Sequence, residues 1–314
     1  MSEVTVNTEW LSDCSGCHLA IVDLHEKILN VLQAVKIQRC PVLTDIKDYP
    51  HATVGLVSGA IRNEHDRHAA QEMRKSCDIV IAWGSCAVFG GPAGAGNIHT
   101  PAEIASAVYQ NNKTTTTAPP PSREVSPLES VVRPIDEVID VDYYLPGCPP
   151  HPLFVFEALT ALVEGRPPEV NRRSVCAKCK RSMVKTDVAA IKANSEGIPD
   201  PEQCFLSQGY TCMGSVTIDR CLAPCPTNGV PCTGCAGATM QILTEPNRDI
   251  RTEIAERMSR LTKIPRQDIV QALERSAKSH YSYTMATAMI GNKPTFHIKK
   301  WIEEENADYE GERV

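Results

Sequence analysis

The placement of cysteine constrains this chain more strongly than any other feature of its sequence. Of its 314 residues, 14 are cysteine; six of these lie before residue 165, and the other eight lie between residues 176 and 235. A chain of this length can bury a hydrophobic core, so it does not need disulfide bonds to fold. The concentration of thiols therefore predicts metal ligation or redox work. The change in their density predicts two domains, residues 1–165 and 166–314.

Charge and hydropathy narrow the class of protein. The net charge is −6, and hydrophobic residues make up 42 % of the chain. An acidic balance argues against a nucleic-acid-binding protein, and this hydrophobic content argues against a disordered one. The sequence has no secretory signal, no twin-arginine motif and no apolar run long enough to span a membrane. We therefore expect a cytoplasmic protein without a membrane span, in a compartment where thiols stay reduced.

The first domain alternates β-rich apolar runs with helical patterns. The runs predict strands at residues 4–11, 53–61, 78–83 and 141–145. The helical patterns cover residues 18–35, 63–76, 100 onwards and 152–164. Asn63 is suited to cap one of these helices, and Thr100-Pro101 to begin another. Strands that alternate with helices predict an α/β fold with a doubly wound parallel sheet.

Four cysteines follow three of the predicted strands. They are Cys14 and Cys17 (DCSGCH), Cys86 (WGSCA) and Cys148 (LPGCPP). In a parallel sheet the carboxyl ends of the strands share one edge, which is where ligands bind in such folds. We therefore expect these four thiols to gather there and to form a sulfur site, holding zinc or an iron–sulfur cluster. The glycine-rich stretch 90–96 matches no nucleotide-binding pattern and predicts a tight loop beside Cys86.

The remaining cysteines separate by spacing. Cys40 and Cys77 lie away from this edge and are expected to be buried and inert. The other eight form two quartets in a polar segment that has too little apolar surface to order itself, so that bound metal would contribute to its folding. One or two helices are expected after it, in residues 249–277. The quartets are Cys176, Cys179, Cys204 and Cys212, and then Cys221, Cys225, Cys232 and Cys235.

Two kinds of metal fit these quartets. Thiols separated by two or three residues suit either zinc or iron–sulfur ligation. Zinc has no redox chemistry, so a zinc protein would be a structural scaffold. Three sulfur sites, one of them at the ligand-binding edge of a sheet, favour an electron-transfer chain, and twelve thiols divided by four give three clusters. A free-standing ferredoxin-like carrier is a third reading, although it would not need the large sheet domain.

The three motifs WLSDCSGCH, WGSCA and LPGCPP, with their spacing, resemble the small subunit of nickel–iron hydrogenases. The resemblance covers about residues 4–237. It implies a flavodoxin-like first domain with a proximal 4Fe–4S cluster on Cys14, Cys17, Cys86 and Cys148. It also implies an irregular second domain, stabilised by iron–sulfur clusters and followed by C-terminal helices. There the distal cluster would be bound by Cys176, Cys179, Cys204 and Cys212, and the medial cluster by Cys221, Cys225, Cys232 and Cys235.

Two departures from the periplasmic members of that family are informative. Many of those proteins have His where this chain has Cys176, and Pro where it has Cys225. With both cysteines present, the resemblance implies three 4Fe–4S clusters. It implies no nickel in this chain, because the nickel–iron centre belongs to the large subunit.

These departures, and the missing leader, resemble the cytoplasmic hydrogenases of methanogenic archaea, in particular the gamma subunit of the methyl-viologen-reducing, coenzyme F-420-non-reducing type. That likeness implies a hydrogenase large subunit, a small 2Fe–2S subunit and heterodisulfide reductase as partners. The deazaflavin-reducing and sulfur-reducing hydrogenases are the neighbouring alternatives.

Overall fold

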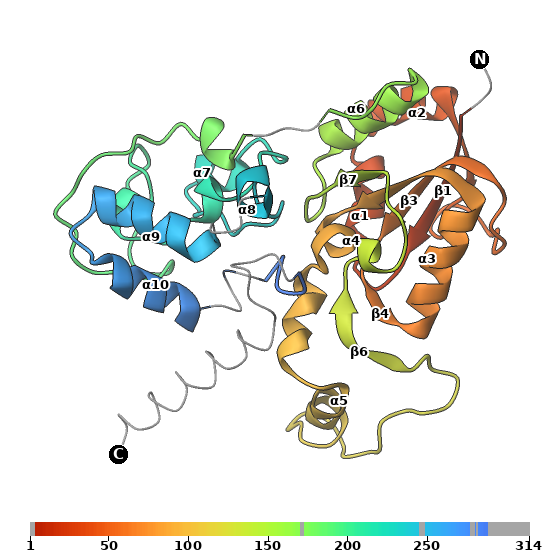
Figure 1. The fold of residues 1–314 in the computed structure, drawn as a ribbon, viewed down its shortest axis with the longest axis horizontal. Coiled ribbons are helices and arrows are strands. Elements are labelled where there is room, and N and C mark those ends of the chain that lie inside the picture. The colour runs from red at the N-terminus through yellow and green to blue at the C-terminus, as the bar shows by residue number, and fades with distance from the viewer. Residues whose placement is uncertain (1–3, 170–172, 245–248, 277–279, 281, 288–314) are drawn as a thin grey trace. The chain divides into compact units, whose positions relative to one another are not determined.

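A computed structural model describes residues 4–169, 173–244, 249–276, 280 and 282–287 (Figure 1). The chain divides into two compact units, Met1–Glu169 and Val170–Val314. Each unit is described by itself.

A five-stranded parallel sheet forms the centre of the first unit (Figure 1). Its strands lie in the order β2-β1-β3-β5-β7. Counted along the chain, this is the 2-1-3-4-5 order of flavodoxin-like folds, which confirms the predicted fold class. Strands β3 and β5 are largely apolar on both faces, as expected for a sheet covered on both sides, whereas β1 buries the polar residues Asn7, Thr8 and Glu9. The five strands are β1 Val4–Trp10, β2 Val35–Arg39, β3 Ala52–Ser58, β5 Cys77–Trp83 and β7 Tyr143–Leu145.

Helices cover both faces of this sheet. On one face Ile21, Val31 and Leu159, from α1, α2 and α6, pack in one core with strand residues. On the other face Met73 of α3 packs against Gly55 of β3, where even a Cβ would lie 3.0 Å from the Met73 Cε. The helices are α1 Gly16–Val22, α2 Ile28–Ala34, α3 Glu64–Ser76, α4 Ser85–Phe89, α5 Pro101–Tyr109 and α6 Pro152–Val163.

The helix starts expected from the sequence are present. The Asn63 side chain accepts a hydrogen bond from the Asp66 N–H (3.0 Å) at the start of α3. Thr100 and Glu103 form a reciprocal capping box at the start of α5, with Pro101 as its first residue. These bonds satisfy backbone donors that the first turn of a helix leaves without partners.

The stretch 18–35 was wrongly predicted as one helix. The chain breaks at His25, whose φ of +52° cannot continue a right-handed helix. The apolar side chains keep a helical spacing on either side of this break, so the pattern alone did not reveal it. Strand β2 was missed, because its VKIQR sequence is short and half polar. A two-stranded antiparallel sheet of β4 (Ile61–Asn63) and β6 (Leu128–Arg133) was also not predicted.

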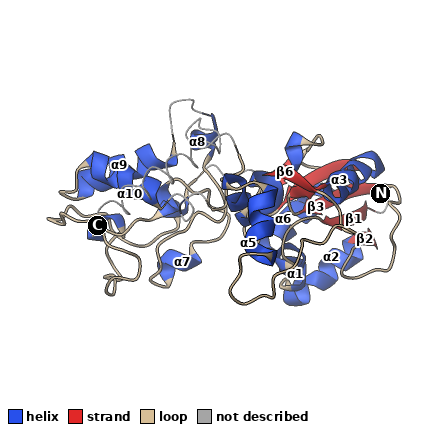
Figure 2. Ribbon diagram, turned by 90° about the horizontal axis from the view of Figure 1, so that it is seen from below, coloured by secondary structure: helices blue, strands red, loops and turns tan. Residues whose placement is uncertain are grey.

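The second unit contains little regular structure in its described part (Figure 2). Its chain follows turns and isolated β-bridges, with α7 Pro224–Thr227, α8 Met240–Thr244, α9 Ile250–Leu261 and α10 Arg266–Arg275. Helices α9 and α10 bury Ile254 and Met258 together with Ile269 and Leu273. The sequence predicted one or two helices in residues 249–277, and the structure has two. Residue 277 of that prediction lies outside the described residues.

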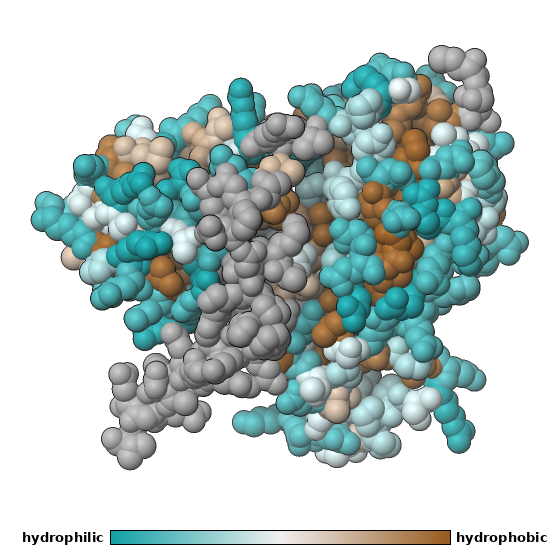
Figure 3. All heavy atoms as spheres, in the orientation of Figure 1, coloured by the Kyte–Doolittle hydropathy of each residue, from teal (hydrophilic) through white to brown (hydrophobic). Residues whose placement is uncertain are grey.

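None of the helices in the described ranges is long and apolar enough to cross a membrane. On the face shown in Figure 3, hydrophilic side chains cover most of the surface of the second unit. The first unit carries a narrow apolar strip on the same face.

Candidate metal centres

The carboxyl ends of β1, β5 and β7 carry four of the thiols. Cys14 and Cys17 follow β1, Cys86 follows β5, and Cys148 follows β7. Burial raises the pKa of the Cys86 thiol to about 12, and the neighbouring Asp13, Cys148 and Cys14 raise it further. Burial also raises the pKa of Cys17, and Asp13 and all three of the other thiols contribute. The structure therefore brings together the four cysteines that the topology predicted.

Glycine is required at two positions beside these thiols. Gly84 has a φ of +88°, and a Cβ there would lie 2.3 Å from the Cys17 sulfur. Gly91 has a φ of +56°, and a Cβ there would lie 2.4 Å from the Cys86 sulfur. No real Cβ sits so close to sulfur, so both residues leave room that a side chain would fill. Gly91 belongs to the glycine-rich loop that the sequence places beside Cys86.

The loops after β5 and β7 are joined by hydrogen bonds. The Gly84 N–H donates to the Leu145 carbonyl (2.9 Å), and the Ser85 N–H donates to the Gly147 carbonyl (2.8 Å). The Gly147 N–H in turn donates to the Ser85 hydroxyl (3.1 Å). Because these bonds link the backbones next to Cys86 and Cys148, they hold both thiols at one edge of the sheet.

Two ionisable side chains lie beside the first quartet. Burial raises the pKa of Asp13 to about 7, although the side chains of Ser58 and Trp10 oppose that rise. Burial lowers the pKa of His18 to about 4. The His18 Nε2 lies 3.1 Å from the Thr8 hydroxyl, and its ring lies 5.0 Å from the Trp83 ring. His18 is thus a neutral, packed residue of α1.

The second unit brings the next four thiols together. Burial raises the pKa of Cys176 to about 11, and the neighbouring Cys204 and Cys179 raise it further. Burial likewise raises the pKa of Cys212 to about 12, with further contributions from Cys176 and Cys204. A Cβ on Gly214 would lie 3.6 Å from both the Cys176 and the Cys212 sulfur. These four residues form the first quartet of the second unit.

Backbone N–H groups point at these sulfurs. The Cys232 N–H donates to the Cys212 sulfur (3.3 Å). Burial raises the pKa of Cys204, and hydrogen bonds from the backbone of Leu206 and Ser207 oppose that rise. Hydrogen bonds to sulfur stabilise thiolates and tune the potentials of iron–sulfur clusters. The donor set therefore suits a thiolate-bound cluster.

The last four thiols lie in two pairs. Burial raises the pKa of Cys221, and Cys225 is among the charges that raise it further. Burial raises the pKa of Cys232. The neighbouring Cys212 raises it further, and Cys235 does so more weakly. Cys232 thus adjoins the preceding quartet, while its sulfur lies 3.8 Å from the Thr217 hydroxyl.

No three His, Cys, Asp or Glu side chains in the described ranges converge as closely as a single metal ion requires. A four-iron cluster is a wider body, and each of its thiolates binds a different iron. The four sulfurs therefore need to surround a volume and not to meet at one point. Thiols grouped around glycine-lined space, with N–H groups aimed at sulfur, fit such a cluster.

Comparison with known proteins shows the family of this chain. Residues 14–162 match the family model for the NADH ubiquinone oxidoreductase, 20 Kd subunit. The chain is 43 % identical over 236 residues to the vhu G subunit of the F420-non-reducing hydrogenase of Methanococcus voltae, covering 75 % of this chain and 82 % of that one. The chain belongs to the family of G subunits of F420-non-reducing hydrogenases. It is therefore the small subunit of a nickel–iron hydrogenase of this type, a family in which the large subunit holds the nickel–iron site.

Two further matches are also to hydrogenases. The G subunit of the F420-non-reducing hydrogenase of Methanothermobacter thermautotrophicus is 34 % identical over 299 residues, covering 93 % of this chain and 97 % of the relative. Among solved structures, an NAD+-reducing nickel–iron hydrogenase in the H2-reduced state matches with a TM-score of 0.52 and 30 % identity. That match covers 54 % of this chain and 95 % of the other.

The hydrogenase chain also contains two cysteines outside the quartets. Cys77 is the first residue of β5 and lies at the amino edge of the sheet, where the Asn7 amide approaches its sulfur (3.9 Å). Cys40 follows β2 and is almost fully buried. Burial of both thiols agrees with their interpretation as inert residues.

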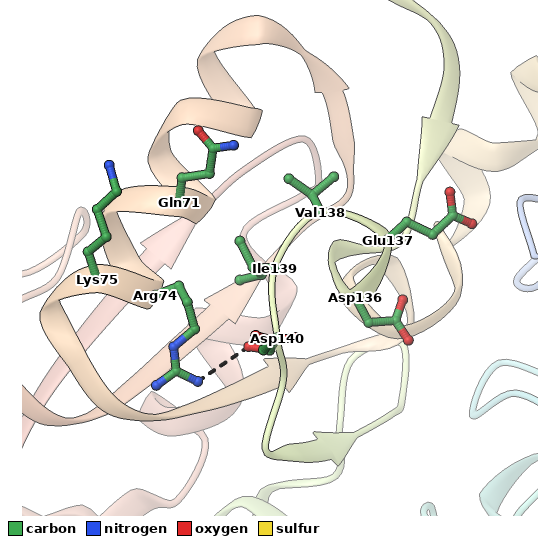
Figure 4. A pocket seen from close by; sticks show the side chains of 8 residues that line it. All are labelled: Gln71, Arg74, Lys75, Asp136, Glu137, Val138, Ile139 and Asp140. Atoms are coloured by element: carbon green, nitrogen blue, oxygen red, sulfur yellow. Dashed lines mark hydrogen bonds between the residues drawn. The ribbon is translucent and has the colours of Figure 1, made fainter.

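A pocket of about 600 Å³ in the first unit lies away from the thiols (Figure 4). Arg74 lines it and donates hydrogen bonds to the carbonyls of Cys77 and Asp78, at the start of β5. The pocket is therefore at the amino edge of the sheet, opposite the first quartet. Its lining contains no cysteine and does not contribute to the candidate centres.

Sequence reasoning missed Arg181, which links the two quartets of the second unit. Its Nη1 donates to the Gln203 carbonyl (3.1 Å), and its Nε donates to the Pro226 carbonyl (3.0 Å). Its guanidinium also stacks 4.0 Å from the Phe205 ring centroid. Gln203 precedes Cys204 and Pro226 follows Cys225, so one cation holds both loops. The sequence signal was a basic residue two positions after a CxxC pair.

Proposed function

We propose that this chain carries electrons through three 4Fe–4S clusters, between the nickel–iron site of its large subunit and a downstream acceptor. The observation that carries this proposal is the gathering of four thiols at the carboxyl ends of β1, β5 and β7, where glycine leaves room beside the sulfurs. Membership in the hydrogenase family supports the same role.

The proposed ligands follow the three quartets. The proximal cluster is bound by Cys14, Cys17, Cys86 and Cys148. The distal cluster is bound by Cys176, Cys179, Cys204 and Cys212. The medial cluster is bound by Cys221, Cys225, Cys232 and Cys235. When bound, each cluster supplies reversible one-electron chemistry.

The protein contributes position, insulation and hydrogen bonds to this chemistry. Gly84 and Gly91 let the backbone approach the proximal sulfurs closely. Burial of Cys17 and Cys212 keeps water away from their sulfurs, and the Cys232 N–H donates to one of them. Such contacts set the potential of each cluster. No proton or bond to hydrogen is handled by the proposed ligands.

The proposal also covers the type of hydrogenase and its partner proteins. The identity is 43 % to an F420-non-reducing relative, 29 % to the delta subunit of sulfhydrogenase 2 of Pyrococcus furiosus and 26 % to the gamma subunit of a coenzyme F420 hydrogenase of Methanosarcina barkeri. These values favour the first type over the sulfur-reducing and deazaflavin-reducing alternatives. We accordingly propose a large subunit, a small 2Fe–2S subunit and heterodisulfide reductase as partners, in the cytoplasm.

Metal analysis of the natively purified complex tests the proposal against a structural zinc scaffold. Three 4Fe–4S clusters require about twelve irons and an equal amount of acid-labile sulfide in this chain, with nickel in the large subunit. Zinc in a Cys₄ site would bring no sulfide and no bleaching of colour on reduction. A complex that contains zinc without sulfide contradicts the proposed function.

A further inference from the structure

Helix α9 packs against the proposed distal quartet although it contains no cysteine. It contacts two short 3₁₀ helices, η5 (Leu206–Gln208) and η6 (Met213–Ser215). The first begins two residues after Cys204, and the second begins directly after Cys212. The helix therefore rests on the two turns that follow these thiols.

The Cys176 thiol adjoins the same packing from another side. Cys176 is the central residue of a third 3₁₀ helix, η4 (Val175–Ala177), which contacts η6. The middle residue of η6 is Gly214, and a Cβ there would lie 3.6 Å from the Cys176 sulfur. The element next to this sulfur is thus the one on which α9 packs.

The side chain of α9 whose charge acts on Cys176 is Arg257. Burial raises the pKa of the Cys176 thiol, while the Arg257 guanidinium and a hydrogen bond with the Ser174 side chain oppose that rise. Both groups therefore stabilise negative charge on this sulfur. The place of Arg257 on the helix is fixed, because Ile254 and Met258 beside it are fully buried.

Two arginines of α9 differ in how closely their charges are paired. Arg257 and Arg260 each lie four residues after a glutamate. The Arg260 guanidinium donates a hydrogen bond to Glu256. The Arg257 Nε is 3.9 Å from the Glu253 carboxylate, too far for a hydrogen bond, and it is buried without a hydrogen-bond partner in the part of the chain that the structure describes.

Exposure separates the same two side chains. The Arg257 side chain is 42 % exposed and the Arg260 side chain is 72 % exposed. Water and salt screen a charge less when protein covers it. The field of Arg257 therefore reaches the neighbouring thiolates, whereas the charge of Arg260 is paired and solvated.

A fixed cation has a definite effect on an iron–sulfur cluster. Net charge, hydrogen bonds to sulfur and exposure set the potential of such a cluster. An electron added to a thiolate-bound cluster makes it more negative, so a nearby cation stabilises the reduced form more than the oxidised form. A positive charge held beside the quartet consequently raises the potential.

We propose that Arg257 is a positioning residue for the distal cluster: it binds no iron, and its charge holds the potential of the cluster on Cys176 above the value that the thiolates alone would give. This inference rests on the proposed function, in which Cys176 is a ligand of that cluster. It gives the cysteine-free helix α9 a part in electron transfer in addition to its part in packing.

The test is a redox titration of the natively purified hydrogenase complex, followed by electron paramagnetic resonance. Cys176→Ala identifies the distal signal as the one that this variant loses. The distal potential is then measured in R257Q, which removes the charge, and in R257K, which keeps it. R260Q is the matched control, because it removes an arginine of the same helix at the same spacing from a glutamate.

We expect R257Q to lower the distal potential. The ratio of reduced to oxidised distal cluster at a fixed potential should fall about tenfold, which corresponds to about 59 mV for one electron. R257K and R260Q should stay close to wild type, and the proximal potential should not move in any of the three variants. Loss of the distal signal from R257Q, with a normal signal in R257K, also supports the role of the charge.

Three results overturn the inference. They are an unchanged distal potential in R257Q, a shift of equal size in R257K or R260Q, and loss of the distal signal from both R257Q and R257K. The last would show that the guanidinium is needed for its shape and not for its charge. The proposed function fails separately, if Cys176→Ala keeps every signal of the wild type or if the wild-type complex has no iron–sulfur signals.

Discussion

The two units of this protein position thiols in opposite ways. In the first, a parallel sheet with helices on both faces would exist without any cluster, and three of its strands end where the thiols are needed. In the second, the thiols lie in turns joined by isolated bridges, around buried side chains such as Phe205, Tyr210 and Met213 and without a strand ladder among the described residues. The first unit holds a site because it is folded, whereas the second is expected to fold because its sites are filled.

Removal of iron should give the largest effect and is the direct way to break this comparison. Without clusters, we expect residues 173–237 to lose their protection against hydrogen exchange, because no strand ladder replaces the lost ligand bonds. The sheet of the first unit should stay protected. Exchange measured peptide by peptide on chain expressed with and without iron checks this. Equal protection of both units in the iron-free chain would contradict the distinction.

Gly84→Ala tests whether the proximal cluster in the first unit can be lost without affecting the clusters of the second. The new Cβ would meet the Cys17 sulfur at 2.3 Å, so we expect the proximal cluster to be lost while the other two remain. Electron paramagnetic resonance of the reduced complex separates the three signals. Gly165→Ala is the matched control, since Gly165 also has a positive φ (+71°) but no atom within 4 Å of its Cβ position. An unchanged proximal signal in Gly84→Ala would contradict the assignment of the proximal cluster to the quartet that contains Cys17.

Arg181→Gln tests the link between the quartets of the second unit. The loss of charged hydrogen bonds to the loops of Cys204 and Pro226 should cost about 1.5–3 kcal/mol of stability. Removal of a nearby positive charge should also lower the midpoint potentials of both clusters. Redox titration followed by electron paramagnetic resonance measures them. Arg260→Gln, which removes an exposed arginine paired with Glu256 on α9, should leave both potentials unchanged.

Asn63→Ala should produce the smallest effect, confined to the first unit. It removes the hydrogen bond from the Asp66 N–H at the start of α3 and is expected to cost about 1 kcal/mol. The midpoint temperature for thermal unfolding of the first unit should fall by a few degrees, while all three cluster signals persist. A loss of distal or medial signal in this variant would show that the units do not respond separately.

The sequence contained most of what places the proximal site. Runs such as DIVIAW, the Asn63 cap and the turns that carry Cys14, Cys86 and Cys148 are local features, and parallel topology then puts their ends on one edge. The break at His25 and the strand β2 depend on packing between distant segments, so local spacing did not reveal them. Zinc and iron–sulfur remained open from spacing alone, because both accept the same thiols.

The second unit was harder to predict for the same physical reason that it is irregular. Its contacts join residues far apart in sequence, such as Arg181 to Pro226 and Ser182 to Glu202. A periodic pattern of apolar residues does not predict contacts of this kind. Spacing divided the cysteines into quartets, but it could not show that Cys232 adjoins Cys212.

The contact between Cys232 and Cys212 has a consequence for assembly. A backbone N–H from a residue of one quartet is the hydrogen-bond donor to a sulfur of the other. Insertion of iron into either quartet therefore orders the backbone at Cys232, which the other quartet also uses. We expect the two insertions to be cooperative for this reason. A population of half-loaded chains would be scarce, and biogenesis of this unit would proceed from empty to full in nearly a single step.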